Sequence, residues 1–194
     1  MLTQQGQMKT NANPNAIQYY IANLPYKYRT AMQKAATVYS SNELESYITI
    51  TTSMTNSNST YKAELFVPPP PAPPGSCDNP LGCDTVVINI MTGDGTEAIA
   101  INHLKYDLND NSKIVGSTVY FDDMIMIDFF QVQKNYIAIH ELGHTLGLKD
   151  LFDDDDVSYQ NKSVMYGKGE YSINVLYKFD IANILWHYKY GYIG

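Results

Sequence analysis

One short segment, His140-Glu141-Leu-Gly-His144, constrains the fold of this 194-residue chain more than any other feature. The surrounding residues predict a helix, with Asp128 as its N-cap and Gly147, which tolerates a positive φ, at its end. Side chains four positions apart lie on one face of a helix, one turn from each other. The imidazoles of His140 and His144 can therefore turn toward the same cation.

The residue types in this segment indicate a catalytic zinc (Zn²⁺) site. Imidazole nitrogen is a good zinc ligand, and a catalytic site uses three protein ligands and keeps one place for water. Glu141 lies beside the two histidines on the helix and not in line with them. We therefore predict that it is the general base that takes a proton from the activated water and carries it to the leaving amine.

The longer string from His140 to Asp150, HELGHTLGLKD, resembles the metzincin signature HExxHxxGxxH. Its last residue resembles the snapalysin-type branch, small secreted bacterial metzincins that use Asp as the third ligand, so the resemblance implies that Asp150 binds the metal. Ser163-Val-Met165-Tyr-Gly167 resembles the family's Met-turn. This implies that Met165 forms a hydrophobic floor under the imidazoles without binding the metal. The segment from Asp180 to Gly191 resembles the closing helix.

The resemblance is strong over residues 136–191 and weak before them, where Ser112–Gly116 resembles the leishmanolysin-like metzincins. It implies an α+β, zincin-like fold: a twisted, mixed and mostly parallel sheet, an active-site helix, a Met-turn and a C-terminal helix. It also implies a peptide substrate that pairs with an edge strand, for which Ser117–Phe121 is the candidate. Tyr166, or alternatively Tyr171, is a candidate for stabilising the oxyanion.

Other side chains are alternatives to Asp150 as the third ligand. Glu170 lies in a Gly-rich segment that is poor helix material, unlike the glutamate of thermolysin-like enzymes. His187, on the last predicted helix, is more often a packing residue, and nothing around His103 suggests a site. The run Asp153–Asp156 is predicted to be a solvated acidic loop, with a Ca²⁺ site as the alternative.

The rest of the chain predicts a single domain over residues 16–194, preceded by a loose tail or pro-segment remnant over residues 1–15. Pro68–Pro74 is predicted to be a surface loop, because prolines cannot sit inside a sheet. The other expected elements are helices at 25–39 and 175–190 and strands at 46–52, 61–67, 85–91 and 117–121.

Composition limits the partners of the chain. A net charge of −7 argues against nucleic acid and anionic membranes, and no apolar run approaches the roughly 20 residues of a membrane-spanning helix. The first residues lack the features of a secretory signal, so the localisation is unknown, although the family resemblance favours secretion. We expect a monomer. Cys77 and Cys83 are expected to form a small disulfide or to stay as thiols.

These observations predict a zinc-dependent endopeptidase that cleaves peptides or proteins. Two other readings stay open, a binding protein built on an inactive metzincin scaffold and a domain with a structural zinc ion. Structural zinc sites are normally closed by four protein ligands and do not need a glutamate beside the first histidine. Glu141 therefore favours catalysis.

Overall fold

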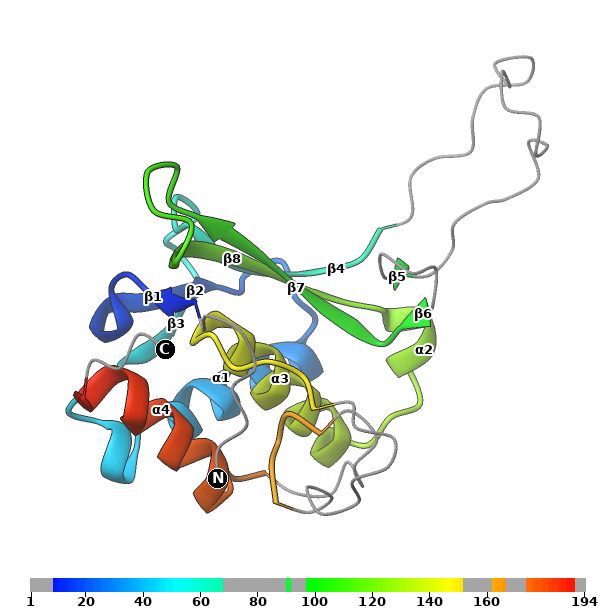
Figure 1. Ribbon diagram of the computed structural model, residues 1–194. Helices are drawn as coiled ribbons and strands as arrows, with labels where there is room; N and C mark the ends of the chain where they lie inside the picture. Colours follow the sequence, from blue (N-terminus) through cyan, green and yellow to red (C-terminus); the bar gives the residue numbers. More distant parts are fainter. Residues whose placement is uncertain (1–8, 68–89, 92–96, 152–161, 167–173, 191–194) are drawn as a thin grey trace, which may run out of the picture.

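The computed structural model consists of a β-sheet with helices packed beneath it (Figure 1). It describes residues 9–67, 90–91, 97–151, 162–166 and 174–190. The strands within these ranges are β1 (Thr10–Asn11), β2 (Ile17–Tyr20), β3 (Ile50–Ser53), β4 (Tyr61–Leu65), β5 (Ile90–Met91), β6 (Glu97–Ala98), β7 (Ala100–Tyr106) and β8 (Lys113–Phe121). The helices are α1 (Tyr26–Tyr39), α2 (Asp123–Met126), α3 (Gln131–Thr145) and α4 (Lys178–Tyr190), with 3₁₀ turns η1 (Pro14–Ala16) and η2 (Asn42–Leu44).

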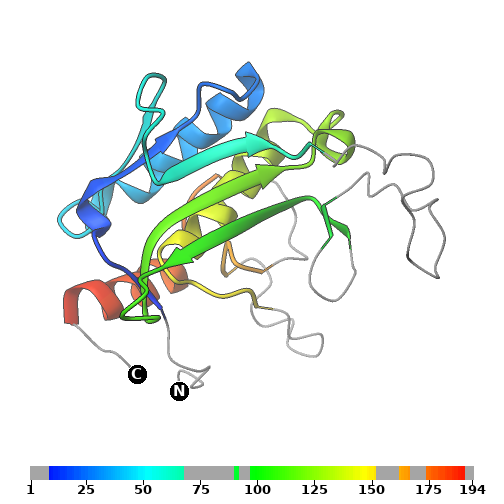
Figure 2. The ribbon, with the colours of Figure 1, turned by 90° about the horizontal axis from the view of Figure 1, so that it is seen from above.

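The main sheet has the order β3-β2-β4-β8-β7, with β1 beside the first residues of β8. All of these pairs are parallel except β7 with β8, which is antiparallel. Among the described strands, β7 therefore forms one edge of the sheet (Figure 2). The prediction that Ser117–Phe121 is an edge strand is wrong, because these residues pair with β4 on one side and with β7 on the other.

Helices α1 and α3 pack beneath the sheet, and the hydrophobic core lies between the two layers (Figure 1). Strand β2 shows how the sequence provides this core: Ile17 and Tyr19 are buried, and the residues between and after them are half-buried. Helix α1 buries Tyr28, Met32 and further residues at three- and four-residue spacing. The α+β class and the mostly parallel sheet are confirmed.

The predicted helices are present, but two begin elsewhere. Helix α3 begins at Gln131, so Asp128 is not its N-cap; instead, the Gln133 side chain accepts a hydrogen bond from the Phe130 N–H. The aspartate that does cap a helix is Asp122, which accepts from two N–H groups at the start of α2. Helix α4 begins at Lys178, three residues later than predicted.

The strand predictions differ more from the structure. Strand β7 was not predicted, β8 begins four residues earlier than expected, and β3 begins four residues later because η2 and a turn precede it. The end of the segment 1–15, which we expected to be a loose tail, is structured: Thr10–Asn11 form β1, and η1 begins at Pro14. Of the strand predicted at 85–91, the structure describes Ile90–Met91, which form β5. No helix within the described ranges is long and apolar enough to cross a membrane.

Candidate metal centre

The end of α3 turns the chain back over the helix face that carries the two histidines. Gly147 has a φ of 90° and donates its N–H to the His144 carbonyl, while the Leu148 N–H donates to Gly143. This pair of hydrogen bonds is a Schellman motif, which favours glycine at the left-handed position. The chain then reaches Asp150, whose neighbour Leu151 donates its N–H to the Met165 carbonyl.

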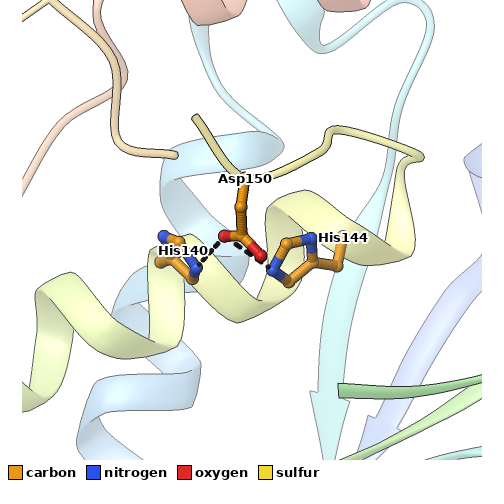
Figure 3. Close-up of side chains that lie close together, drawn as sticks. All are labelled: His140, His144 and Asp150. Carbon is orange, nitrogen blue, oxygen red and sulfur yellow. Dashed lines mark ion pairs between the residues drawn. The ribbon is translucent and has the colours of Figure 1, made fainter. Parts of the chain in front are cut away.

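This turn brings Asp150 between the two imidazoles, as Figure 3 shows. Its Oδ1 atom lies 2.9 Å from Nε2 of His140 and 3.4 Å from Nε2 of His144. One ligand atom from each of the three residues lies within 4.8 Å of the others, so the group can hold a metal ion. All three side chains are half-buried.

Both imidazoles are held by main-chain carbonyls. His140 Nδ1 lies 2.9 Å from the Val164 oxygen, and His144 Nδ1 lies 2.9 Å from the Leu148 oxygen. A carbonyl oxygen only accepts hydrogen bonds, so each Nδ1 donates a hydrogen to its carbonyl, and Nε2 is the ring atom directed toward Asp150. Such a second contact fixes the tautomer and the ring orientation of histidines that bind metal.

The two separations between Asp150 and the imidazoles can be compared with the ligand spacing around a zinc ion. Ligands about 2.0–2.1 Å from zinc, at the tetrahedral angle, lie about 3.3 Å from one another. The two separations between Asp150 and the imidazoles are close to this value. Two imidazole nitrogens and one carboxylate oxygen are also a common donor set for catalytic zinc.

The charges of the group indicate that a proton competes with a metal ion for His144. Burial by itself would lower the pKa of His144, but the hydrogen bond to Asp150 and the charges of Glu141 and Asp150 raise it to about 9. Burial tends to raise the pKa of Asp150, yet the two imidazoles hold it well below its usual range. The metal-free group therefore combines a carboxylate with an imidazolium, and a metal ion must replace a proton on His144.

Glu141 is buried beside the metal group, with 5% of its surface exposed. Its Oε2 atom is buried and has no hydrogen-bond partner within the described residues. Burial raises the pKa of this carboxyl, against the opposing effect of His140 and His144. A buried carboxylate with an unpaired oxygen is costly for stability, so its presence next to a metal group points to a chemical role.

The predicted Met-turn contains a tight turn over Ser163–Tyr166 that packs under α3. Met165 is 2% exposed, and a Cβ on Gly143 would lie only 2.5 Å from its Sδ atom. The sulfur therefore packs against the helix between the two histidines, and the role of Met165 as a floor that does not bind the metal stays a prediction. Gly143 is required for this close approach.

Two residues that the sequence analysis did not single out hold this turn. Asp180, in the first turn of α4, accepts from the Ser163 hydroxyl at 2.5 Å and from the Val164 N–H at 2.9 Å. The Tyr136 hydroxyl donates to the carbonyls of Val164 and Tyr166, both at 3.1 Å. Both contacts position the Val164 carbonyl that holds His140. A signal for Asp180 was present in the sequence, as an acidic residue near the start of a helix.

The remaining predicted residues fall into three groups. Tyr166 is buried and pairs through its main chain with Leu151, so it lies next to Asp150 in the fold; its role at the oxyanion stays a prediction. Among the described residues, His103 and His187 do not belong to the metal group. The predictions that lie outside the described residues are those for Pro68–Pro74, Cys77, Cys83, Asp153–Asp156, Glu170 and Tyr171.

No protein-family model matches the sequence, and no curated protein is similar enough to count as a relative. The chemistry of the site must therefore be judged from its own residues.

Proposed function

We propose that this chain is a zinc-dependent endopeptidase of the metzincin type. The observation that carries the proposal is the convergence of His140, His144 and Asp150 on one point, with a Glu141 carboxylate oxygen on the same helix that no described residue pairs with. The Met-turn segment under the helix supports the same conclusion. The elements of the fold, an α+β plan with a mostly parallel sheet, are compatible with it.

The donor set favours zinc over other metals. Calcium and magnesium prefer oxygen ligands in larger or octahedral sets, whereas two imidazoles and one carboxylate suit zinc. His140, His144 and Asp150 would hold the ion and leave its fourth position for water or substrate. A structural zinc site would use a fourth protein ligand, and the described residues bring only these three together.

A bound zinc ion and Glu141 would have different roles in the reaction. A bound zinc ion supplies a Lewis acid, which lowers the pKa of the attacking water and polarises the scissile carbonyl. Glu141 takes a proton from that water as it attacks the carbonyl carbon, and then gives this proton to the leaving amine nitrogen. Burial favours this exchange, because it brings the pKa of Glu141 closer to neutral pH.

The substrate is an extended peptide that pairs with β7, and not with the interior residues Ser117–Phe121. Strand β7 is the sheet edge that lies beside α3, and the Asn102 side chain on β7 donates to the Glu141 carbonyl at 2.6 Å. A peptide added to this edge would be held by main-chain hydrogen bonds next to Glu141 and the metal group.

The test compares the wild-type protein with Glu141→Ala, measuring casein or peptide cleavage and bound zinc in both. Glu43→Gln, which changes an exposed glutamate in η2, is the matched control. We expect the wild type and the control to cleave, and Glu141→Ala to keep its zinc while losing at least about a hundredfold in kcat.

Three results would contradict the proposal in different ways. If all three proteins bind zinc and none cleaves, the inactive-scaffold interpretation takes its place. If Glu141→Ala cleaves as fast as the control, Glu141 is not the general base. If the wild type does not bind zinc, the ligand set itself is wrong.

A further inference from the structure

Asn102 connects the sheet edge to the active-site helix through its side chain. Its Nδ2 atom donates to the Glu141 carbonyl at 2.6 Å and to Thr145 Oγ1 at 2.9 Å. The Glu141 carbonyl can only accept, which fixes the orientation of the Asn102 amide. Both contacts cross from β7 to α3, and one of them reaches the main chain of the proposed general base itself.

The main chain of Asn102 faces the open edge of the sheet. Ser117 donates its N–H to Thr60, and Phe121 accepts from Phe66, so the odd-numbered residues of this part of β8 direct their main chain toward β4. The even-numbered residues of β8 therefore bond to β7. The N–H of Asp122, which comes directly after β8, follows this pattern and donates to the Ile99 carbonyl. In an antiparallel pair these directions alternate.

The residues of β7 that pair with odd-numbered β8 residues consequently turn their main-chain groups away from the sheet. These residues are Ala100, Asn102 and Leu104, opposite Phe121, Val119 and Ser117. They are the positions at which an added peptide strand finds N–H and C=O groups. Asn102 is the middle one of the three, and it also contacts Glu141.

The environment of the Asn102 amide indicates that stability alone does not explain why an asparagine occupies this position. Its Oδ1 atom is buried and accepts no hydrogen bond within the described residues. Thr145, its second partner, is already held by the Tyr19 hydroxyl at 2.6 Å and lies near Ser117. A buried, unpaired carbonyl oxygen is a cost that an apolar residue of the same shape would avoid.

We propose, on the premise of the function given above, that Asn102 is a positioning residue that couples peptide binding on β7 to the placement of Glu141. A peptide that bonds to the main chain of Asn102 immobilises this residue, and its amide then holds the Glu141 peptide group. Binding at a distance from the scissile bond is thus used to orient the general base, which raises kcat in addition to lowering KM.

The experiment measures kcat and KM for two peptides that share one scissile bond. One has about four residues and the other about eight, long enough to cover residues 100–104 at about 3.4 Å per residue. The variant is Asn102→Leu, which keeps the shape of the side chain and removes both donors. His103→Gln is the matched control, because His103 is exposed and stacks edge-on against Tyr120 on β8.

We expect that extension of the peptide raises kcat in the wild type and in His103→Gln. In Asn102→Leu, extension should still lower KM, but kcat for the long peptide should fall by about ten- to hundredfold, the effect of losing one or two hydrogen bonds. The kcat for the short peptide should change by less than about threefold, with bound zinc unchanged. Asn102→Ser provides the same comparison if the leucine variant does not fold.

An equal loss of kcat for both peptides would overturn the coupling and show that Asn102 only supports the fold. No loss for either peptide would overturn it as well. If the wild type cleaves neither peptide, the proposed function fails first and the coupling fails with it, a result that differs from the other two.

Discussion

Gly147 is the residue at which a single methyl group should disturb the metal centre most. Its φ of 90° lies in the left-handed region, which costs other residues about 1–2 kcal/mol. A Cβ at this position would also overlap the carbonyl oxygen of Lys9, which comes directly before β1. Displacing a packed main-chain segment costs about 1–3 kcal/mol more.

Gly147→Ala should therefore lower the free energy of unfolding by about 3 kcal/mol, and the melting temperature by roughly 6–12 °C for a domain of this size. The same turn places the Leu148 carbonyl that holds His144, so zinc affinity should fall as well. Urea unfolding and a zinc titration with a competing chelator measure the two effects.

Gly147→Asn separates the two causes, because asparagine tolerates the left-handed region better than alanine but brings the same Cβ. If the overlap with Lys9 dominates, both variants should be destabilised to a similar degree. A loss below about 1 kcal/mol in Gly147→Ala would refute the reasoning, since it would be smaller than the cost of the left-handed φ alone.

Three further predictions concern the metal group and the start of α3. Because the pKa of His144 is raised to about 9 in the metal-free protein, its proton stabilises that form fully below about pH 6.5 and is lost toward pH 9. Zinc affinity should thus rise about tenfold per pH unit from pH 6 to 8, and a flat titration over that interval would contradict this. Asp150→His should move the optimum of the pH–rate profile to lower pH, because it removes a negative ligand that weakens zinc as a Lewis acid; an unchanged profile would count against the assignment of Asp150. Lys134→Met should lower the free energy of unfolding in urea by about 2–4 kcal/mol, whereas the exposed Lys27→Met should change it little, because the buried Lys134 ammonium donates to the carbonyls of Met126 and Phe129. Equal stability of the two lysine variants would show that these contacts are not maintained in solution.

Interactions between residues close in the sequence were sufficient to predict the helix that carries the candidate site. The spacing of His140 and His144 placed them on one face, and Gly147 marked the helix end, as the structure confirms. Both depend on interactions within a few residues, which a sequence displays directly. The helix start was harder: Asp128 is a good cap by residue type, but α3 begins only at Gln131, and the aspartate that caps a helix, Asp122, belongs to the separate short helix α2.

The sheet was harder to predict from the sequence, because its strands depend on contacts between distant parts of the chain. Strand β7 escaped prediction because its residues, Ala-Ile-Asn-His-Leu-Lys-Tyr, mix polar and apolar side chains on both faces, and it is stable only as the partner of β8. Thr10–Asn11 likewise form a strand only because β8 offers a free main chain and the buried Asn11 bonds to Tyr61.

The sequence alone determined which residues form the candidate metal centre, since two histidines, a glutamate and an aspartate within eleven positions are a property of the chain. Tertiary structure decided how they are used. Carbonyls of the following turns direct Nε2 of each imidazole toward Asp150, and one oxygen of Glu141 has no partner among the described residues. The fold also puts β7, and not β8, at the sheet edge beside the site. Local patterns cannot show these features, because burial, tautomer and sheet order are set by residues far away in the sequence.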